Sequence, residues 1–165
     1  MTALLALTVV HVAISLVAIV AGFVVIYGML VSKDLRRWTA FFLTTTVLTS
    51  ASGFVFPVDR FLPSHAFGIL SLVLLAVSIH ALYTRKLAGG WRHAYVGTAI
   101  AAQYLNFFVL VVQSFLKVPA LKALAPTQTE VPFAVAQLVT LVAFIVLGVM
   151  ATRRFHSQTS ALKTV

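Results

Sequence analysis

The sequence predicts an all-α protein built as an integral membrane bundle of five helices. Of its 165 residues, 61% are hydrophobic and 9% are charged, and the mean hydropathy is +1.07. One soluble core cannot bury so much apolar surface, so the composition favours a membrane protein. The formal net charge of +9 comes from basic residues that flank apolar runs. This placement indicates topology signals and lipid contacts, and we expect no nucleic-acid partner.

The first two helices are predicted at residues 3–31 and 38–56. The first run has no basic residue before it, is longer than a signal peptide and is followed by Lys33, Arg36 and Arg37. We therefore expect a retained helix instead of a cleaved leader. The interior of the second run is rich in Ser and Thr, whose hydroxyls bond either their own backbone or a neighbouring helix.

The remaining helices are predicted, in chain order, at residues 64–84, 93–116 and 131–151. A short basic turn around Gly89 and Gly90 joins the third helix to the fourth. All five prolines fall in the other two connections on the opposite side, so none interrupts a helix. Residues 1–151 are thus expected to form one transmembrane domain, followed by a polar cytoplasmic tail over residues 152–165.

The basic residues predict an N-out, C-in orientation. Nine of the twelve Lys and Arg residues fall on the side that holds the C-terminus, whereas Arg60, Lys117 and Lys122 fall on the other side. Cytoplasmic loops carry the excess of positive charge in membrane proteins. The side with nine basic residues is therefore expected to face the cytoplasm.

The acidic residues exclude several function classes. Asp34, Asp59 and Glu130 are the only carboxylates, and each falls in a predicted loop or at a helix edge. An ion-coupled carrier usually holds an acid near mid-membrane, and none is expected there. Because the chain has no cysteine, thiolate metal sites and iron–sulfur clusters are excluded. No nucleotide-binding, metalloprotease or serine-hydrolase motif occurs, and no catalytic residue is assigned.

Four histidines form two predicted tiers, with His11 and His65 in the outer tier and His80 and His93 in the inner tier. Bis-His b-type haem needs two imidazoles at one depth from different helices. This layout resembles the small di-haem b-type membrane cytochromes, which pass electrons across the bilayer between a quinone or other reductant and an acceptor. The resemblance implies haem b as the cofactor, with one histidine pair per haem. Interfacial histidines bonded to headgroups, water or backbone, or a divalent metal site, are the alternatives.

A polar stripe runs along one face of the fourth predicted helix. Its members are Gln103, Asn106, Gln113 and Lys117, with Tyr104 beside them. Amides in hydrocarbon need hydrogen-bond partners, so the stripe is expected to face other helices or a wet cavity. Gln137, Thr140 and the hydroxyls of the second helix are the expected partners. The stripe is interpreted either as interhelical contact or as a pocket for a quinone headgroup or small solute.

The chain as a whole resembles small polytopic inner-membrane proteins of bacteria, in the segment from His11 to Gly22 and at Trp91-Arg92-His93. The resemblance implies a multi-pass protein of the bacterial cytoplasmic membrane. Two functions stay open at this point. One is electron transfer through haem held by the bundle histidines. The other is a non-enzymatic role, as an accessory subunit of a larger complex or as a binder of lipid, quinone or small solute.

Overall fold

The computed structural model describes residues 3–57 and 63–156, and this part of the chain is helical without strands. The sequence predicts the polar tail from residue 152, but the last helix continues to Arg154. The part of the tail from residue 157 onward lies outside the described residues, as do Asp59 and Arg60.

Five long helices make up the fold. They are α1 (Ala3–Leu30), α2 (Arg36–Ser52), α3 (Pro63–Ile79), α4 (Trp91–Lys117) and α6 (Val131–Arg154). Three short elements accompany them: the 3₁₀ turn η1 (Gly53–Val55), the π-helical turn η2 (His80–Thr84) and the helix α5 (Pro119–Leu124). With η1 and η2 counted as extensions of α2 and α3, five helices are long and apolar enough to cross a membrane. The predicted all-α fold with five such helices is confirmed.

Local sequence explains where these helices begin and end. The 28 residues of α1 contain no proline or charge and span about 42 Å. Its C-terminus is closed by Ser32, whose φ of 53° is left-handed, and the Lys33 N–H bonds the Gly28 carbonyl at 2.8 Å. This is the geometry of a Schellman cap. Prolines stand in the first turn of α3, α5 and α6, where a missing N–H breaks no helical bond.

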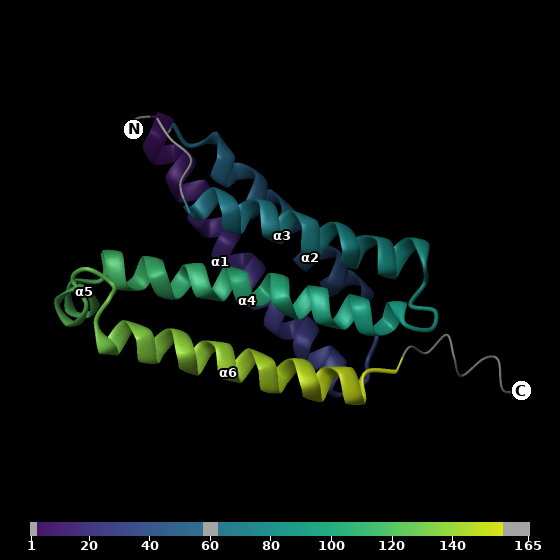
Figure 1. Cartoon of the computed structure of the whole chain (residues 1–165). Coiled ribbons are helices and arrows are strands. Elements are labelled where there is room, and N and C mark those ends of the chain that lie inside the picture. The colour runs from purple at the N-terminus through teal and green to yellow at the C-terminus, as the bar shows by residue number, and fades with distance from the viewer. Residues whose placement is uncertain (1–2, 58–62, 157–165) are drawn as a thin grey trace, which may run out of the picture.

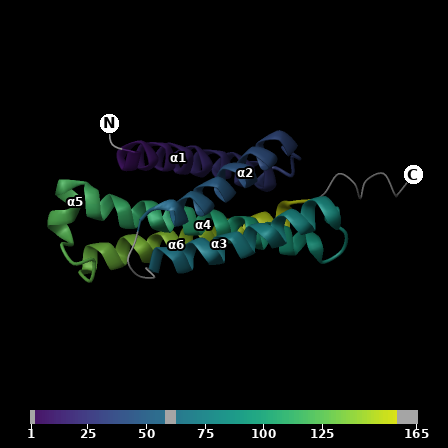
Figure 2. The same cartoon turned by 90° about the horizontal axis from the view of Figure 1, so that it is seen from above.

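Helix α4 is the centre of the bundle. It lies between α3 and α6 in Figure 1, and α1 packs against it from another side. Helix α2 crosses obliquely and packs against α1 and α3 (Figure 2). The α1–α2 turn, the α3–α4 hairpin and the C-terminus of α6 meet at one end, which we call the basic end. The other end holds α5, and we call it the α5 end.

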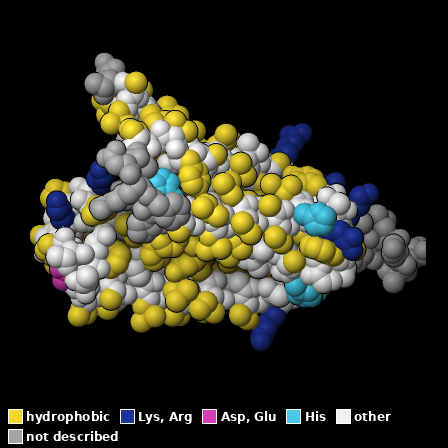
Figure 3. All heavy atoms as spheres, turned by 45° about the horizontal axis from the view of Figure 1, so that its top comes forward, with side chains coloured by type: hydrophobic (Ala, Val, Ile, Leu, Met, Phe, Trp, Pro, Cys, Tyr) yellow, Lys and Arg dark blue, Asp and Glu magenta, His cyan; other side chains and the backbone are white. Residues whose placement is uncertain are grey.

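The core is narrow and the outer surface is apolar. The buried cluster follows α4 through Val96, Ala99 and Ala102 and includes Phe42 and Phe144 from its neighbours. Large Val, Leu and Ile side chains are exposed along α1 and α6. In Figure 3 hydrophobic side chains cover the middle of the visible face, and Lys and Arg gather towards its ends. A belt of this kind suits a hydrocarbon surrounding.

Hydroxyl pairs join the helices inside this apolar shell. Ser50 of α2 donates to Ser71 of α3 at 3.0 Å, and Ser78 of α3 pairs with Thr98 of α4 at 2.6 Å. Thr45 instead bonds the backbone of its own helix. Both uses expected for the hydroxyls of the second helix therefore occur.

Candidate functional site

His11 sits where α1 meets the end of α2. Its Nδ1 lies 2.8 Å from the hydroxyl oxygen of Ser52, and its ring meets the Phe56 ring edge-on at 5.3 Å between centroids. Gly53 lies beside the imidazole, and a Cβ there would meet Cε1 at 3.9 Å, which is an ordinary van der Waals contact. The half-buried ring therefore packs against protein and is held by one hydroxyl.

His65 opens α3 at the same end of the bundle and is buried. Its ring lies 5.5 Å from the ring of Phe54, which belongs to η1. The segment at the end of α2 thus contacts both outer histidines, through different side chains. Because α2 packs against both α1 and α3, it is the element that positions His11 and His65 relative to each other.

His80 and His93 lie at the basic end and are both exposed. The His80 ring meets the Trp91 ring edge-on at 5.0 Å, and the Arg85 guanidinium lies 5.2 Å from the same indole. For His93, Nη2 of Arg92 lies 2.8 Å from Nε2. A guanidinium can only donate, so Nε2 is the acceptor and Nδ1 carries the proton.

The fit of these residues to haem differs between the tiers. Iron binds the imidazole lone pair, and the Nε2 lone pair of His93 faces Arg92, so ligation through Nε2 would require this exposed guanidinium to move aside. In the outer tier, the Ser52 contact on Nδ1 is of the type that orients a ligating imidazole. Within the described residues, no three His, Asp or Glu side chains gather as metal ligands. Haem ligation stays a prediction.

Gln103 fixes α4 against α1 in the middle of the bundle. Its side chain is fully buried, and Nε2 donates to the Ile19 carbonyl at 2.8 Å. The amide fits because position 22 is glycine: a Cβ there would lie 2.1 Å from Oε1. In the described chain Oε1 has no hydrogen-bond partner. This member of the stripe is an interhelical contact.

The other stripe residues separate along α4. Asn106 donates to the Thr46 hydroxyl of α2 at 3.4 Å, and Tyr104 packs on Phe144 with centroids 5.7 Å apart. Gln113 and Lys117 are exposed towards the α5 end. Of the expected partners on α6, Gln137 donates to the Phe108 carbonyl of α4 at 3.4 Å, whereas Thr140 bonds its own helix. The structure does not bring the stripe together around one cavity, and its ligand-binding role stays a prediction.

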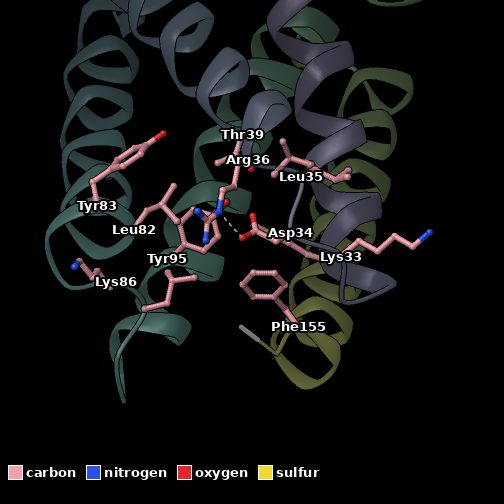
Figure 4. A pocket seen from close by; sticks show the side chains of 13 residues that line it. Lys33, Asp34, Leu35, Arg36, Thr39, Leu82, Tyr83, Lys86, Tyr95 and Phe155 are labelled. Carbon is pink, nitrogen blue, oxygen red and sulfur yellow. Dashed lines mark hydrogen bonds and ion pairs between the residues drawn. The ribbon is translucent and has the colours of Figure 1, made fainter. Parts of the chain in front are cut away.

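A pocket of about 380 Å³ opens at the basic end, and no candidate residue of the sequence analysis lines it. It lies among the α1–α2 turn, η2, the start of α4 and the C-terminal end of α6 (Figure 4). We call it the basic-end pocket. Its charged and hydroxyl-bearing lining residues are Lys33, Asp34, Arg36, Thr39, Tyr83, Lys86 and Tyr95. Its apolar lining residues are Val25, Met29, Leu35, Leu82, Leu87 and Phe155.

The polar groups of the basic-end pocket have a defined arrangement. Nε of Arg36 lies 2.8 Å from a carboxylate oxygen of Asp34, and this exposed ion pair lies among the other lining side chains (Figure 4). The ring of Tyr95 is buried and lies 6.0 Å from the ring of Phe155 between centroids. In Figure 4 the side chain of Lys33 extends away from the pocket. Arg36 is therefore the cation placed to meet a ligand there.

Irregular backbone surrounds this pocket. Ser32, Lys86 and Leu87 all have positive φ without being glycine, with values of 53°, 50° and 58°. The π-helical turn η2 contributes Leu82 and Tyr83 to the lining. Left-handed non-glycine residues cost about 1–3 kcal/mol each, and π-helical turns occur often at functional sites. Several such features around one pocket mark it as the candidate site.

The sequence predicts Lys33, Arg36 and Lys86 only as determinants of orientation. That role accounts for their positive charge but not for their place around one pocket. The lining comes from segments between Val25 and Phe155. Only the packing of those segments shows that they share a cavity.

Comparison of the chain with models of protein families, with curated proteins and with solved structures finds no match.

Proposed function

We propose that the chain is a multi-pass protein of the bacterial cytoplasmic membrane that binds a small anionic ligand in the basic-end pocket. In this proposal the N-terminus lies outside and the basic end faces the cytoplasm. The ligand carries a phosphate or carboxylate attached to an apolar body. The observation that carries the proposal is that one pocket is lined both by cationic residues, Arg36 and Lys86, and by apolar side chains that include Phe155.

Charge supports this orientation. Eight of the ten described Lys and Arg residues lie at the basic end, and Lys117 and Lys122 lie at the α5 end. Such an excess marks the cytoplasmic side. The belt of exposed apolar side chains between the two ends supports insertion in a bilayer.

The chemistry of the lining supports the ligand class. The lining includes three cationic residues and one carboxylate, Asp34, which is already paired with Arg36. Hydroxyls of Thr39, Tyr83 and Tyr95 add groups that hydrogen-bond anionic oxygens. The volume of about 380 Å³ is within the range of small-molecule sites, roughly 300–1,000 Å³.

A thermal-shift titration in neutral detergent tests the proposal, with unfolding followed by tryptophan fluorescence. The probes are inorganic phosphate and, separately, a short-chain phosphatidic acid. A ligand at ten times its Kd should stabilise the fold by about 1.4 kcal/mol. Stabilisation by both probes supports a free anion, and stabilisation by phosphatidic acid alone supports a lipid headgroup. Stabilisation by neither contradicts the proposal.

Two substitutions separate ligand binding from a structural ion pair. Arg36→Gln should weaken binding about fivefold, because it removes one surface cation that attracts the anion. Its side chain is 83% exposed, so its removal should cost the fold little. Asp34→Asn should strengthen binding, since it removes a competing carboxylate. Arg154→Gln is the matched control at the same end, outside the lining. Weaker binding in both Arg36→Gln and Asp34→Asn would contradict the assignment.

A further inference from the structure

A second hollow lies on the side of the bundle, between α4 and α6. Its volume is about 490 Å³, and it is separate from the basic-end pocket because the two share no lining residue. Among the residues that line this α4–α6 groove are Gly97, Ala101, Tyr104, Phe144, Gly148 and Arg153. The groove is open at Gly97, where an added Cβ would meet no atom within 4 Å.

The length of the groove matches one acyl chain. On α6 its lining runs from Leu141 to Arg153, and twelve residues of rise correspond to about 18 Å. One leaflet supplies about half of a hydrocarbon core of roughly 30 Å. The groove therefore extends from the basic end to about the depth that an acyl chain of that leaflet reaches.

The charge of Arg153 indicates which chemical group would bind at the basic end of the groove. Arg153 is exposed, and among the described residues no carboxylate lies within ion-pair distance of it. The neighbouring Arg92 is engaged differently, because Nη1 donates to the backbone carbonyls of Thr152 and Phe155 at the end of α6. Arg92 thus holds the end of α6 against α4. The guanidinium of Arg153 is instead accessible to an anionic group from outside the protein.

A phospholipid satisfies this arrangement better than a second copy of the chain. In a symmetric pair about an axis along the membrane normal, the two Arg153 guanidiniums would lie at one depth in the interface. Like charges in that position oppose association. A phospholipid brings an anionic phosphate to Arg153 and an apolar chain to the surface around Phe144.

We propose that the α4–α6 groove is a lipid site that holds one acyl chain of an anionic phospholipid, with its headgroup on Arg153. The inference rests on the proposed membrane insertion but not on the basic-end pocket. The site would give the protein a preference for anionic lipid on its basic side.

Native mass spectrometry of protein equilibrated with phosphatidylglycerol and phosphatidylcholine tests the site. Gly97→Leu should fill the groove and remove one retained phospholipid, whereas Val146→Leu, on an exposed α6 position outside the groove, should not. Arg153→Gln should lower the preference for phosphatidylglycerol about fivefold. Arg154→Gln, its neighbour outside the lining, should not.

The outcomes separate this proposal from the one above. Lipid retention unchanged in Gly97→Leu, or lipid preference unchanged in Arg153→Gln, would overturn the site. A dimer that Gly97→Leu converts to a monomer without loss of lipid would identify a second copy as the occupant and also overturn it. Gly97→Leu should remove one retained phospholipid from the Arg36→Gln variant as it does from the unsubstituted protein, which supports a separate site. Release of the protein from membranes by alkaline carbonate would overturn both proposals.

Discussion

Substitution of Gly22 by Ala tests how α1 and α4 are held together. The added Cβ would lie 2.1 Å from Oε1, 2.3 Å from Cδ and 2.8 Å from Nε2 of Gln103. The amide must move, although its side chain has no exposed surface and is bonded to the Ile19 carbonyl. The substitution therefore overfills a site where the helices approach closely.

The expected loss of stability follows from three contributions. Overpacking in a filled core costs about 1–3 kcal/mol. Loss of the Gln103–Ile19 hydrogen bond costs about 0.6 kcal/mol, with an upper value near 1.7 kcal/mol in membrane proteins. The better helix propensity of Ala offsets about 1 kcal/mol. We expect Gly22→Ala to destabilise the bundle by about 1–3 kcal/mol.

Equilibrium unfolding in mixed micelles with increasing SDS measures this difference. Gly97→Ala is the matched control on α4, because its Cβ meets no atom within 4 Å. It should be neutral or slightly stabilising. Adding Gln103→Ala to Gly22→Ala should cost less than the sum of the single changes, because the two groups share one space. Equal stability of Gly22→Ala and the unsubstituted protein would refute the reasoning.

Three further predictions concern other parts of the bundle. Ser78→Ala and Thr98→Ala should each lower the free energy of unfolding by up to about 1.7 kcal/mol in the same assay. If the loss in the double variant equals the sum of the two single losses, the two hydroxyls are not hydrogen-bonded to each other. Desolvation acts to raise the pKa of Glu130, but hydrogen bonds led by that of the Thr127 hydroxyl outweigh it and lower the pKa. Hydrogen exchange should therefore show the loop before α6 intact above about pH 4.5 and loosening as pH falls through the lowered pKa. Glu130→Gln should remove that pH dependence of hydrogen exchange. If the dependence is unchanged in this variant, a group other than Glu130 causes it. His93→Ala should leave any Soret absorbance of the purified protein unchanged, since a guanidinium already occupies Nε2, and a loss would restore His93 as a ligand.

The five long helices could be predicted because their signal is local. Long apolar runs without proline, each ended by charge or proline, need no knowledge of the packing. The helix α5 could not be predicted this way, since its six residues are too few for a periodic pattern. The π-helical turn η2 was likewise placed within an ordinary helix, because its i to i+5 bonding leaves no compositional mark.

The sites depended on packing that the sequence does not contain. The spacing of Gln103 and Asn106 predicted a shared face, and both contact neighbouring helices as that interpretation required. The same spacing predicts that Gln113 and Lys117 also contact neighbouring helices. In the structure they lie further along α4 and are exposed. The role of Gly22 beside Gln103 needed coordinates, because the two positions are 81 residues apart in sequence.

Single-cysteine labelling of intact cells is the most direct test of the account, since both proposed sites depend on a membrane bundle with its basic end in the cytoplasm. The chain has no cysteine, so each variant carries one thiol. Ala88→Cys marks the exposed hairpin at the basic end, and Ala123→Cys marks α5. A membrane-impermeant maleimide should label Ala123→Cys directly and Ala88→Cys only after permeabilisation. The reverse pattern, or labelling of both positions in intact cells, would contradict the account.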